Sequence, residues 1–236
     1  MLQARGASHA PHFSEVAPPM LLPAVIIEPT EPHTASVIWL HGLGASGHDF
    51  EPIVPLLQMP WARFVFPHAP DQAVTINGGM VMPSWYDIRH FNWDDAGRED
   101  EAQVRSSAAK VDALIAHEAK TVPSPRIVLA GFSQGGALAL YVANRYPATL
   151  AGVLILSAYL LPGATDVTDA NAATPTLFAH GRYDDVVPFI AGQRAHAATQ
   201  SPKRPVAWRD YPCGHEVVQD EIRDVARFLH ERLPRS

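Results

Sequence analysis

The chain has 236 residues, of which 47% are hydrophobic and 18% are charged, and these ordinary globular values exclude general disorder, collagen-like repeats and a coiled coil. Its length is at the upper end of what one hydrophobic core supports, so one large domain is expected over residues 21–236. The formal net charge of −6 gives no basic footprint for nucleic acid or anionic lipid, and no apolar run approaches the ~18 residues that cross a bilayer, so neither nucleic acid nor stable membrane insertion is expected.

Residues 1–20 are predicted to form a flexible N-terminal arm, because they contain Pro11, Pro18 and Pro19 and offer little apolar surface to bury. They lack the continuous apolar stretch of a signal peptide. The chain has a single cysteine, Cys213, which cannot form an intramolecular disulfide and fits a reducing compartment. We therefore expect a cytoplasmic protein.

Between residues 36 and 233, short apolar runs alternate with longer amphipathic ones. The short runs predict strands at residues 36–40, 63–66, 126–130, 152–157, 176–179 and 206–211. The long runs predict helices at residues 100–119, 134–145, 189–200 and 216–233. Most of these strands are apolar on both faces, which is typical of strands covered by helices on each side. The pattern predicts an α/β fold with a mainly parallel central sheet, helices on both faces and no large lid domain.

The segment between Pro67 and Gly97 has no clear period. It carries several methionine and aromatic residues, among them Met80 and Trp85, and is too long and too apolar for a plain connector. Loops of this kind are usually functional.

A G-x-S-x-G pattern, Gly131-Phe132-Ser133-Gln134-Gly135, lies between the predicted strand at 126–130 and the predicted helix at 134–145. In this context the pattern indicates a nucleophile elbow, a sharp strand-to-helix turn that holds a serine in a strained conformation. Small residues two positions before and after the serine avoid clashes, and Gly131 and Gly135 meet that need. Ser133 is the candidate nucleophile.

A serine hydroxyl needs an adjacent base that is itself oriented by an acid, and in this fold class the chain order is Ser, then acid, then His. Asp184 and Asp185 follow the predicted strand at 176–179, and His215 follows the one at 206–211. The two neighbouring carboxylates cannot both point at one imidazole. We assign the acid to Asp184 and keep Asp185 as the alternative.

The tetrahedral intermediate requires two backbone donors for its oxyanion. One is expected from Gln134, the residue after the nucleophile, and the other from Leu43 in the glycine-containing loop after the strand at 36–40. The same loop matches the dinucleotide pattern G-x-G-x-x-G from Gly42 to Gly47. No acidic residue follows near positions 63–68, which leaves nicotinamide binding as a weak alternative.

Metal chemistry is not expected, because the 12 histidines form no H-E-x-x-H motif and one cysteine cannot make a zinc-type cluster. The reaction inferred from Ser133 and its partners needs no cofactor.

With these motifs in place, residues 24 to 233 resemble the carboxylesterase and acyl-protein thioesterase family of α/β hydrolases, also described as phospholipase/carboxylesterase. The motifs that carry the resemblance are His41-Gly42-Leu43-Gly44, Pro67-His68-Ala69-Pro70, Asn77-Gly78-Gly79, Ser84-Trp85-Tyr86-Asp87, Gly131-Phe132-Ser133-Gln134-Gly135-Gly136, His180-Gly181, Val187-Pro188 and Gly214-His215. The resemblance implies a triad of Ser133, Asp184 and His215, with Leu43 and Gln134 as the oxyanion donors. Family analogy also allows a homodimer.

The expected function is hydrolysis of small carboxylic esters with short to medium acyl chains, through an acyl-enzyme. Met80, Trp85 and Val187 are the candidate residues for binding the acyl chain. Two alternatives stay open. In the first, the enzyme is an acyl-protein thioesterase or a lysophospholipase, so its substrate is a protein thioester or a lysophospholipid. In the second, the chain is a non-catalytic binding protein that kept the pocket.

Overall fold

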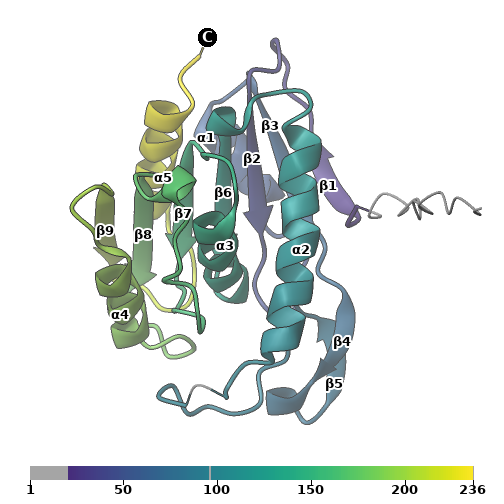
Figure 1. Cartoon of the computed structure of the whole chain (residues 1–236), viewed down its shortest axis with the longest axis vertical. Helices are drawn as coiled ribbons and strands as arrows, with labels where there is room; N and C mark the ends of the chain where they lie inside the picture. The colour runs from purple at the N-terminus through teal and green to yellow at the C-terminus, as the bar shows by residue number, and fades with distance from the viewer. Residues whose placement is uncertain (1–20, 96, 236) are drawn as a thin grey trace, which may run out of the picture.

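A seven-stranded sheet runs through the middle of the molecule (Figure 1). The computed structural model describes residues 21–95 and 97–235, so the arm expected over residues 1–20 lies outside the described residues. The strands, in spatial order, are β1 (Ala24–Ile27), β3 (Ala62–Pro67), β2 (Ala35–Leu40), β6 (Ile127–Phe132), β7 (Gly152–Leu156), β8 (Thr176–Gly181) and β9 (Val206–Tyr211). Only β1 is antiparallel to its neighbour, which confirms the predicted mainly parallel sheet.

Helices cover both faces of the sheet, as predicted. On one face lie α2 (Glu101–Glu118), α3 (Gln134–Arg145) and α4 (Phe189–Thr199), and Figure 1 shows α2 and α3 in front of β2 and β6. On the other face lie α1 (Val54–Leu57) and α5 (Gln219–Arg232). Successive strand residues alternate between the two cores: Ile38 packs with the first group of helices, and Val37 and Trp39 pack with the second. Burial on both faces explains why these strands are apolar throughout.

Two strands that the sequence pattern did not predict form a separate hairpin. β4 (Asp71–Val74) and β5 (Met80–Pro83) pair antiparallel, and a short 3-10 turn at Thr75–Asn77 joins them. Gly78 and Gly79 follow that turn with φ values of 68° and 79°, a left-handed conformation that suits glycine. The segment between Pro67 and Gly97 therefore has more regular structure than its sequence indicated.

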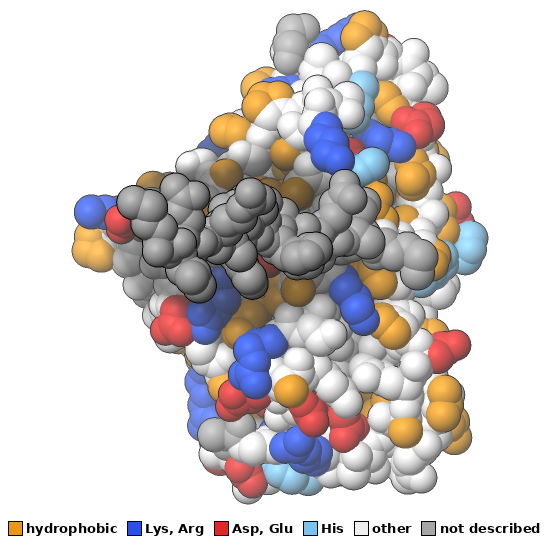
Figure 2. All heavy atoms as spheres, turned by 45° about the vertical axis from the view of Figure 1, so that its right-hand side comes forward, with side chains coloured by type: hydrophobic (Ala, Val, Ile, Leu, Met, Phe, Trp, Pro, Cys, Tyr) orange, Lys and Arg blue, Asp and Glu red, His pale blue; other side chains and the backbone are white. Residues whose placement is uncertain are grey.

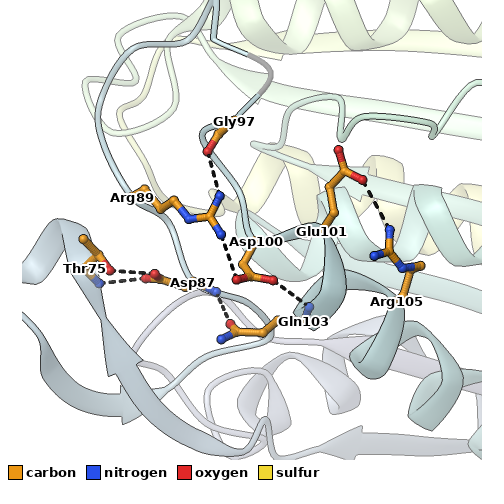
Figure 3. A network of polar contacts seen from close by, with 8 residues as sticks. All are labelled: Thr75, Asp87, Arg89, Gly97, Asp100, Glu101, Gln103 and Arg105. Atoms are coloured by element: carbon orange, nitrogen blue, oxygen red, sulfur yellow. Dashed lines mark hydrogen bonds and ion pairs between the residues drawn. The ribbon is translucent and has the colours of Figure 1, made fainter.

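Polar side chains fix the segment that leads from β5 into α2 (Figure 3). The carboxylate of Asp87 accepts hydrogen bonds from the Thr75 amide and hydroxyl at 2.7 and 2.6 Å. Arg89 contacts the Asp100 carboxylate at 2.8 Å, and Asp100 caps α2 by accepting the Gln103 amide at 3.0 Å. The loop between them is thus held at both ends by charged or capping contacts.

The molecular surface mixes charge types. On the face drawn in Figure 2, hydrophobic, acidic and basic side chains are interspersed. Several exposed charges are paired, for example Arg145 with Asp166 at 2.6 Å and Arg194 with Asp94 at 2.7 Å. Within the described ranges, no helix has both the length and the apolar character that spanning a membrane demands.

Candidate active site

The turn from β6 into α3 holds Ser133 in a strained conformation, with φ 55° and ψ −122°. Two glycines make that turn sterically accessible. A Cβ added at Gly131 would lie 2.3 Å from the Gly135 carbonyl oxygen, and one added at Gly135 would lie 2.4 Å from the His41 carbonyl oxygen. The strain is localised at the one residue whose hydroxyl must project from the end of the sheet. This is the geometry of a nucleophile elbow.

The structure brings Ser133, His215 and Asp184 into one hydrogen-bonded chain. Ser133 Oγ lies 2.9 Å from His215 Nε2, and His215 Nδ1 lies 2.7 Å from Asp184 Oδ2. An ionised carboxylate can only accept a hydrogen bond, so Nδ1 carries the proton and Nε2 is free to accept the serine hydroxyl. These residues follow β6, β8 and β9, whose carboxyl ends meet at one edge of the sheet.

Asp184 is held as a carboxylate by a set of donors. Its Oδ1 accepts the amides of Val186 and Val187 at 3.0 and 2.8 Å, and its Oδ2 faces His215 and, at 3.4 Å, His180 Nε2. Burial by itself would raise the pKa of Asp184, but the hydrogen bonds from His180 and His215 and the nearby backbone amide together hold it well below its usual range. The carboxylate is therefore charged at every physiological pH.

The neighbouring Asp185 lies apart from this chain of contacts. Its side chain is exposed, whereas Asp184 is buried with 7% of its surface accessible. Of these two carboxylates, it is Asp184 that contacts the imidazole of His215. The geometry therefore favours the first of the two acids that the sequence offered.

The two expected oxyanion donors flank the serine. Gln134 is the first residue of α3, and amides in the first turn of a helix have no acceptor within the helix. Leu43 lines the same two cavities as Ser133, and a Cβ added at the adjacent Gly42 would lie 3.4 Å from Ser133 Cβ. Both amides therefore belong to segments packed around the nucleophile.

A layer of buried side chains supports these donor loops. His41 Nδ1 donates to the Gly42 carbonyl at 2.7 Å, and its Nε2 accepts the Ala69 amide at 3.0 Å. Burial lowers the pKa of His41, which suits a neutral imidazole in this bracing role. The Trp85 indole donates to the His41 carbonyl at 2.8 Å, and the Gln134 side chain accepts the Trp85 amide at 2.9 Å.

Two cavities open on either side of Ser133. The first is a wide groove of about 460 Å³ that reaches His215, Glu216 and Asp49. The second is a smaller pocket of about 140 Å³ whose walls include Ile76, Ile88 and Val187. Leu43, Ser133 and Val186 border both cavities, so the nucleophile lies at their junction.

Two of the three residues expected to bind the acyl chain lie elsewhere. Val187 does line the smaller pocket. Trp85 is 1% exposed and lines neither cavity, because its indole is used to brace the His41 loop. Met80 is 64% exposed on the β4–β5 hairpin and is also absent from both linings. Neither Met80 nor Trp85 therefore borders the two cavities next to Ser133, and their role in substrate binding stays a prediction.

Sequence reasoning missed several residues around the site. His180 contacts the acid, and its position before a glycine at a strand end, like that of His41, was the available signal. Trp93, Arg98 and Tyr159 line the smaller pocket but belong to irregular segments without a pattern. Among the described residues, no group of three His, Cys, Asp or Glu side chains is arranged to hold a metal ion.

Known proteins are similar to this chain in sequence and architecture. The family model described as Phospholipase/Carboxylesterase matches residues 22–233. The chain is 36% identical to acyl-protein thioesterase 1 of Gibberella zeae over 230 residues, covering 92% of this chain and 96% of that protein. It is 37% identical to acyl-protein thioesterase 1 of Neurospora crassa over 234 residues, covering 92% and 93%.

Solved structures of related proteins have a similar fold. The crystal structure of Arabidopsis thaliana SOBER1 is similar with a TM-score of 0.78 and 32% identity, and the match covers 85% of this chain and 99% of that one. The crystal structure of Zea mays acyl-protein thioesterase 2 has a TM-score of 0.77 and 28% identity, with 90% and 99% covered.

Proposed function

The chain belongs to the phospholipase/carboxylesterase family of α/β hydrolases, and from this premise we propose that Ser133, His215 and Asp184 hydrolyse carboxylic esters and thioesters through an acyl-enzyme. The observation that carries the proposal is the continuous contact from Ser133 Oγ through His215 to Asp184, at 2.9 and 2.7 Å. A strained serine next to an oriented neutral imidazole is what activates a hydroxyl near neutral pH.

In the first half-reaction, Ser133 Oγ attacks the acyl carbonyl carbon while His215 Nε2 takes the hydroxyl proton. The carbonyl oxygen becomes an oxyanion that the amides of Leu43 and Gln134 stabilise. When the tetrahedral intermediate collapses, the bond to the leaving oxygen or sulfur breaks, and His215 returns the proton to that atom. The charge of Asp184 stabilises the imidazolium between these two transfers.

In the second half-reaction a water molecule replaces the leaving group. His215 takes a proton from the water as its oxygen attacks the acyl-enzyme carbonyl. The intermediate collapses with cleavage of the bond to Ser133 Oγ, which recovers the proton from His215. The products are a carboxylic acid and the free enzyme.

The two cavities support a proposed direction for the substrate. His215 protonates the leaving group and borders the wide groove, so the alcohol or thiol part lies there. The acyl chain then extends into the smaller pocket, which borders Gln134 and is lined by Ile88 and Val187. Its volume of about 140 Å³ supports a preference for short to medium acyl chains.

The second candidate is a protein thioesterase. Two observations favour it: the curated relatives carry the name acyl-protein thioesterase 1, and the groove on the leaving-group side, about 460 Å³, is wide enough for more than a small alcohol. Both candidates use the same nucleophile and differ only in what leaves. The chain's single cysteine, Cys213, is free and buried, and a free thiol supports our expectation of a cytoplasmic enzyme, because disulfides are rare in that compartment.

The test has two stages. A fluorophosphonate should label the wild-type chain on Ser133 and leave Ser133→Ala unlabelled, since only an activated serine reacts; an unlabelled wild-type chain would indicate a binding protein instead. The second stage compares kcat/KM for an aryl ester, an S-acylated peptide and a lysophospholipid that carry one common acyl group. A ranking with the peptide first would select the thioesterase candidate.

A further inference from the structure

Three side chains separate the acyl pocket from another cavity. Trp93, Arg98 and Tyr159 line the pocket of about 140 Å³ next to Ser133. The same three also line a cavity of about 360 Å³ that reaches Leu160, Pro162 and Arg194 and does not border Ser133. The two cavities thus share these three residues, Trp93, Arg98 and Tyr159, which we call the Arg98 wall.

The Arg98 wall is a compact stack. The guanidinium carbon of Arg98 lies 3.7 Å from the Trp93 ring centroid and 4.6 Å from that of Tyr159. The two rings also meet edge to face, with centroids 5.2 Å apart. Cation–π and edge-to-face contacts of this kind favour one arrangement of all three groups. Arg98 is only 5% exposed, so it forms a filled partition and not a mobile surface chain.

The contacts behind the stack hold it in place. The Arg98 guanidinium pairs with the buried carboxylate of Glu99, and the Tyr159 hydroxyl lies 2.8 Å from that of Tyr86. The loop that carries Trp93 and Arg98 is fixed by the Arg89 contacts to Asp100 and to the Gly97 carbonyl, at 2.8 and 3.3 Å (Figure 3). An acyl chain would have to break several of these contacts to pass.

We propose that the Arg98 wall sets the maximum acyl-chain length of this enzyme, and that the cavity beyond it would accept the distal part of a longer chain once the wall is removed. The proposal rests on the function proposed above, since it gives the smaller pocket to the acyl group. A chain that fits the pocket gains from each methylene it buries. A longer chain meets the filled stack of Trp93, Arg98 and Tyr159, which leaves no room for further methylenes.

The side facing the outer cavity is suited to an apolar chain. Leu160, Leu161 and Ala191 contribute to its lining beside the aromatic rings of the wall, and charged side chains, Asp94, Asp95, Glu99 and Arg194, also border it. Each methylene that becomes buried raises kcat/KM about fourfold, following the usual transfer free energy of a methylene group. Once the wall is removed, burial of further methylenes in this cavity should therefore raise kcat/KM for longer acyl chains.

The experiment measures kcat/KM for p-nitrophenyl esters from acetyl to palmitoyl. For the wild type we expect a rise from acetyl to medium chains and a fall at the longest. Trp93→Ala removes one side of the stack without touching the ion pair. Arg98→Ala is combined with Glu99→Gln, because the Glu99 carboxyl would otherwise stay buried without its partner. In both variants the palmitoyl to butyryl ratio should rise by roughly tenfold or more.

Two control variants isolate the cause. Arg98→Met, made together with Glu99→Gln so that the buried carboxyl is not left without its partner, keeps a long side chain in the wall but removes the charges. It should keep the wild-type chain-length profile within about twofold, because such a volume-conserving change leaves the partition filled. Arg194→Ala alters an exposed residue that lines only the outer cavity and should also leave the profile unchanged. Near-UV circular dichroism verifies that each variant keeps its tertiary packing, and Trp93→Ala serves as the test if the double variant with Arg98→Ala fails to fold.

Three results would overturn the proposal. An unchanged profile in folded Trp93→Ala and in the double variant with Arg98→Ala would show that the wall is not the limit. An equal shift in the double variant with Arg98→Met would show that charge, and not bulk, excludes long chains. A wild-type chain that neither hydrolyses any ester nor reacts with a fluorophosphonate would overturn the proposed function together with this inference, whereas activity on short chains with an unchanged profile overturns the inference alone.

Discussion

His180 Nε2 lies 3.4 Å from Oδ2 of Asp184, the same carboxylate oxygen that His215 contacts. It also lies 2.9 Å from the Val187 carbonyl, so it must carry its proton on Nε2 to serve two acceptors. The Val187 amide in turn donates to Asp184 at 2.8 Å. One buried imidazole therefore joins the acid of the triad to a residue of the acyl pocket.

From this contact we predict that His180 positions the acid. His180→Phe keeps a planar aromatic ring, slightly larger than the imidazole, but removes the N–H donor. The ring at position 180 packs directly against Gly192, where an added Cβ would lie 2.2 Å from His180 Nδ1. We expect kcat to fall roughly tenfold or more, as for a lost hydrogen bond to a charged group, with a smaller change in KM. His180→Gln, which restores a donor, should recover part of kcat. Equal kcat in the wild type and in His180→Phe would refute the positioning role.

The choice of acid is tested by paired substitutions. Asp184→Asn should lower kcat by about 10⁴-fold, because an amide at this position favours the wrong imidazole tautomer. Asp185→Asn changes an exposed carboxylate outside the chain of contacts and should leave kcat close to the wild-type value. Steady-state kinetics on one short-chain ester decides the matter, and the reverse ranking would transfer the role to Asp185.

The elbow predicts that Gly131 cannot carry a side chain. The Cβ of Gly131→Ala would lie 2.3 Å from the Gly135 carbonyl oxygen, so the turn must shift and Ser133 must leave its position. We expect loss of fluorophosphonate labelling and a lower melting temperature. Gly78→Ala is the matched control, because a Cβ added there would have no atom of the described residues within 4 Å. Only the left-handed φ of 68° strains this variant, at a cost of about 1–2 kcal/mol. A labelled Gly131→Ala protein would contradict the prediction.

Glu221 should make the free energy of unfolding depend on pH. It is fully buried in α5, and neither carboxylate oxygen has a hydrogen-bond partner among the described residues. Burial raises its pKa to about 8, against an opposing contribution from the Val218 backbone and with a smaller reinforcing one from Asp224. Because this pKa is raised on folding, the stability it contributes is complete below its ordinary pKa of 4.5 and is lost as the pH rises through about 8.

The isosteric variant Glu221→Gln should therefore match the wild type near pH 4 and become the more stable protein at alkaline pH. The difference should grow by at most about 1.4 kcal/mol per pH unit between those limits. Urea denaturation at several pH values measures it. A constant difference across the range would show that Glu221 does not titrate on unfolding, and Asp220→Asn, at an exposed position of the same helix, provides the control.

The central strands and the serine turn could be predicted because their sequence patterns are local. β6 reads as an apolar run that ends in a glycine-flanked serine, and its neighbours are buried on both faces. β1, β4 and β5 could not be predicted in this way, since each has four residues and only partial burial. Their existence depends on pairing with a partner strand, which periodicity within four residues does not show.

The pocket lining was less predictable than the triad. Ser133, the Asp184–Asp185 pair and His215 each follow a predicted strand, so chain order could place them at one edge of the sheet but could not choose between the two acids. Whether Trp85 faces a cavity or the protein interior depends on its contact with the His41 carbonyl, 44 positions away. The same applies to Arg98, whose place between two aromatic rings results from tertiary packing alone.

Gln134 has two roles, one proposed for its main-chain amide and one that its side chain performs through hydrogen bonds. Its amide is the proposed oxyanion donor, while its carboxamide contacts the Trp85 amide, the Tyr86 carbonyl at 2.7 Å and the Ser84 hydroxyl at 3.1 Å. Replacing the side chain leaves the amide in place but releases residues 84–86. A substitution at position 134 would therefore keep one main-chain donor in the chain but loosen the Trp85 segment that braces the His41 loop, and so would reach the second donor, Leu43, from the other side of the nucleophile.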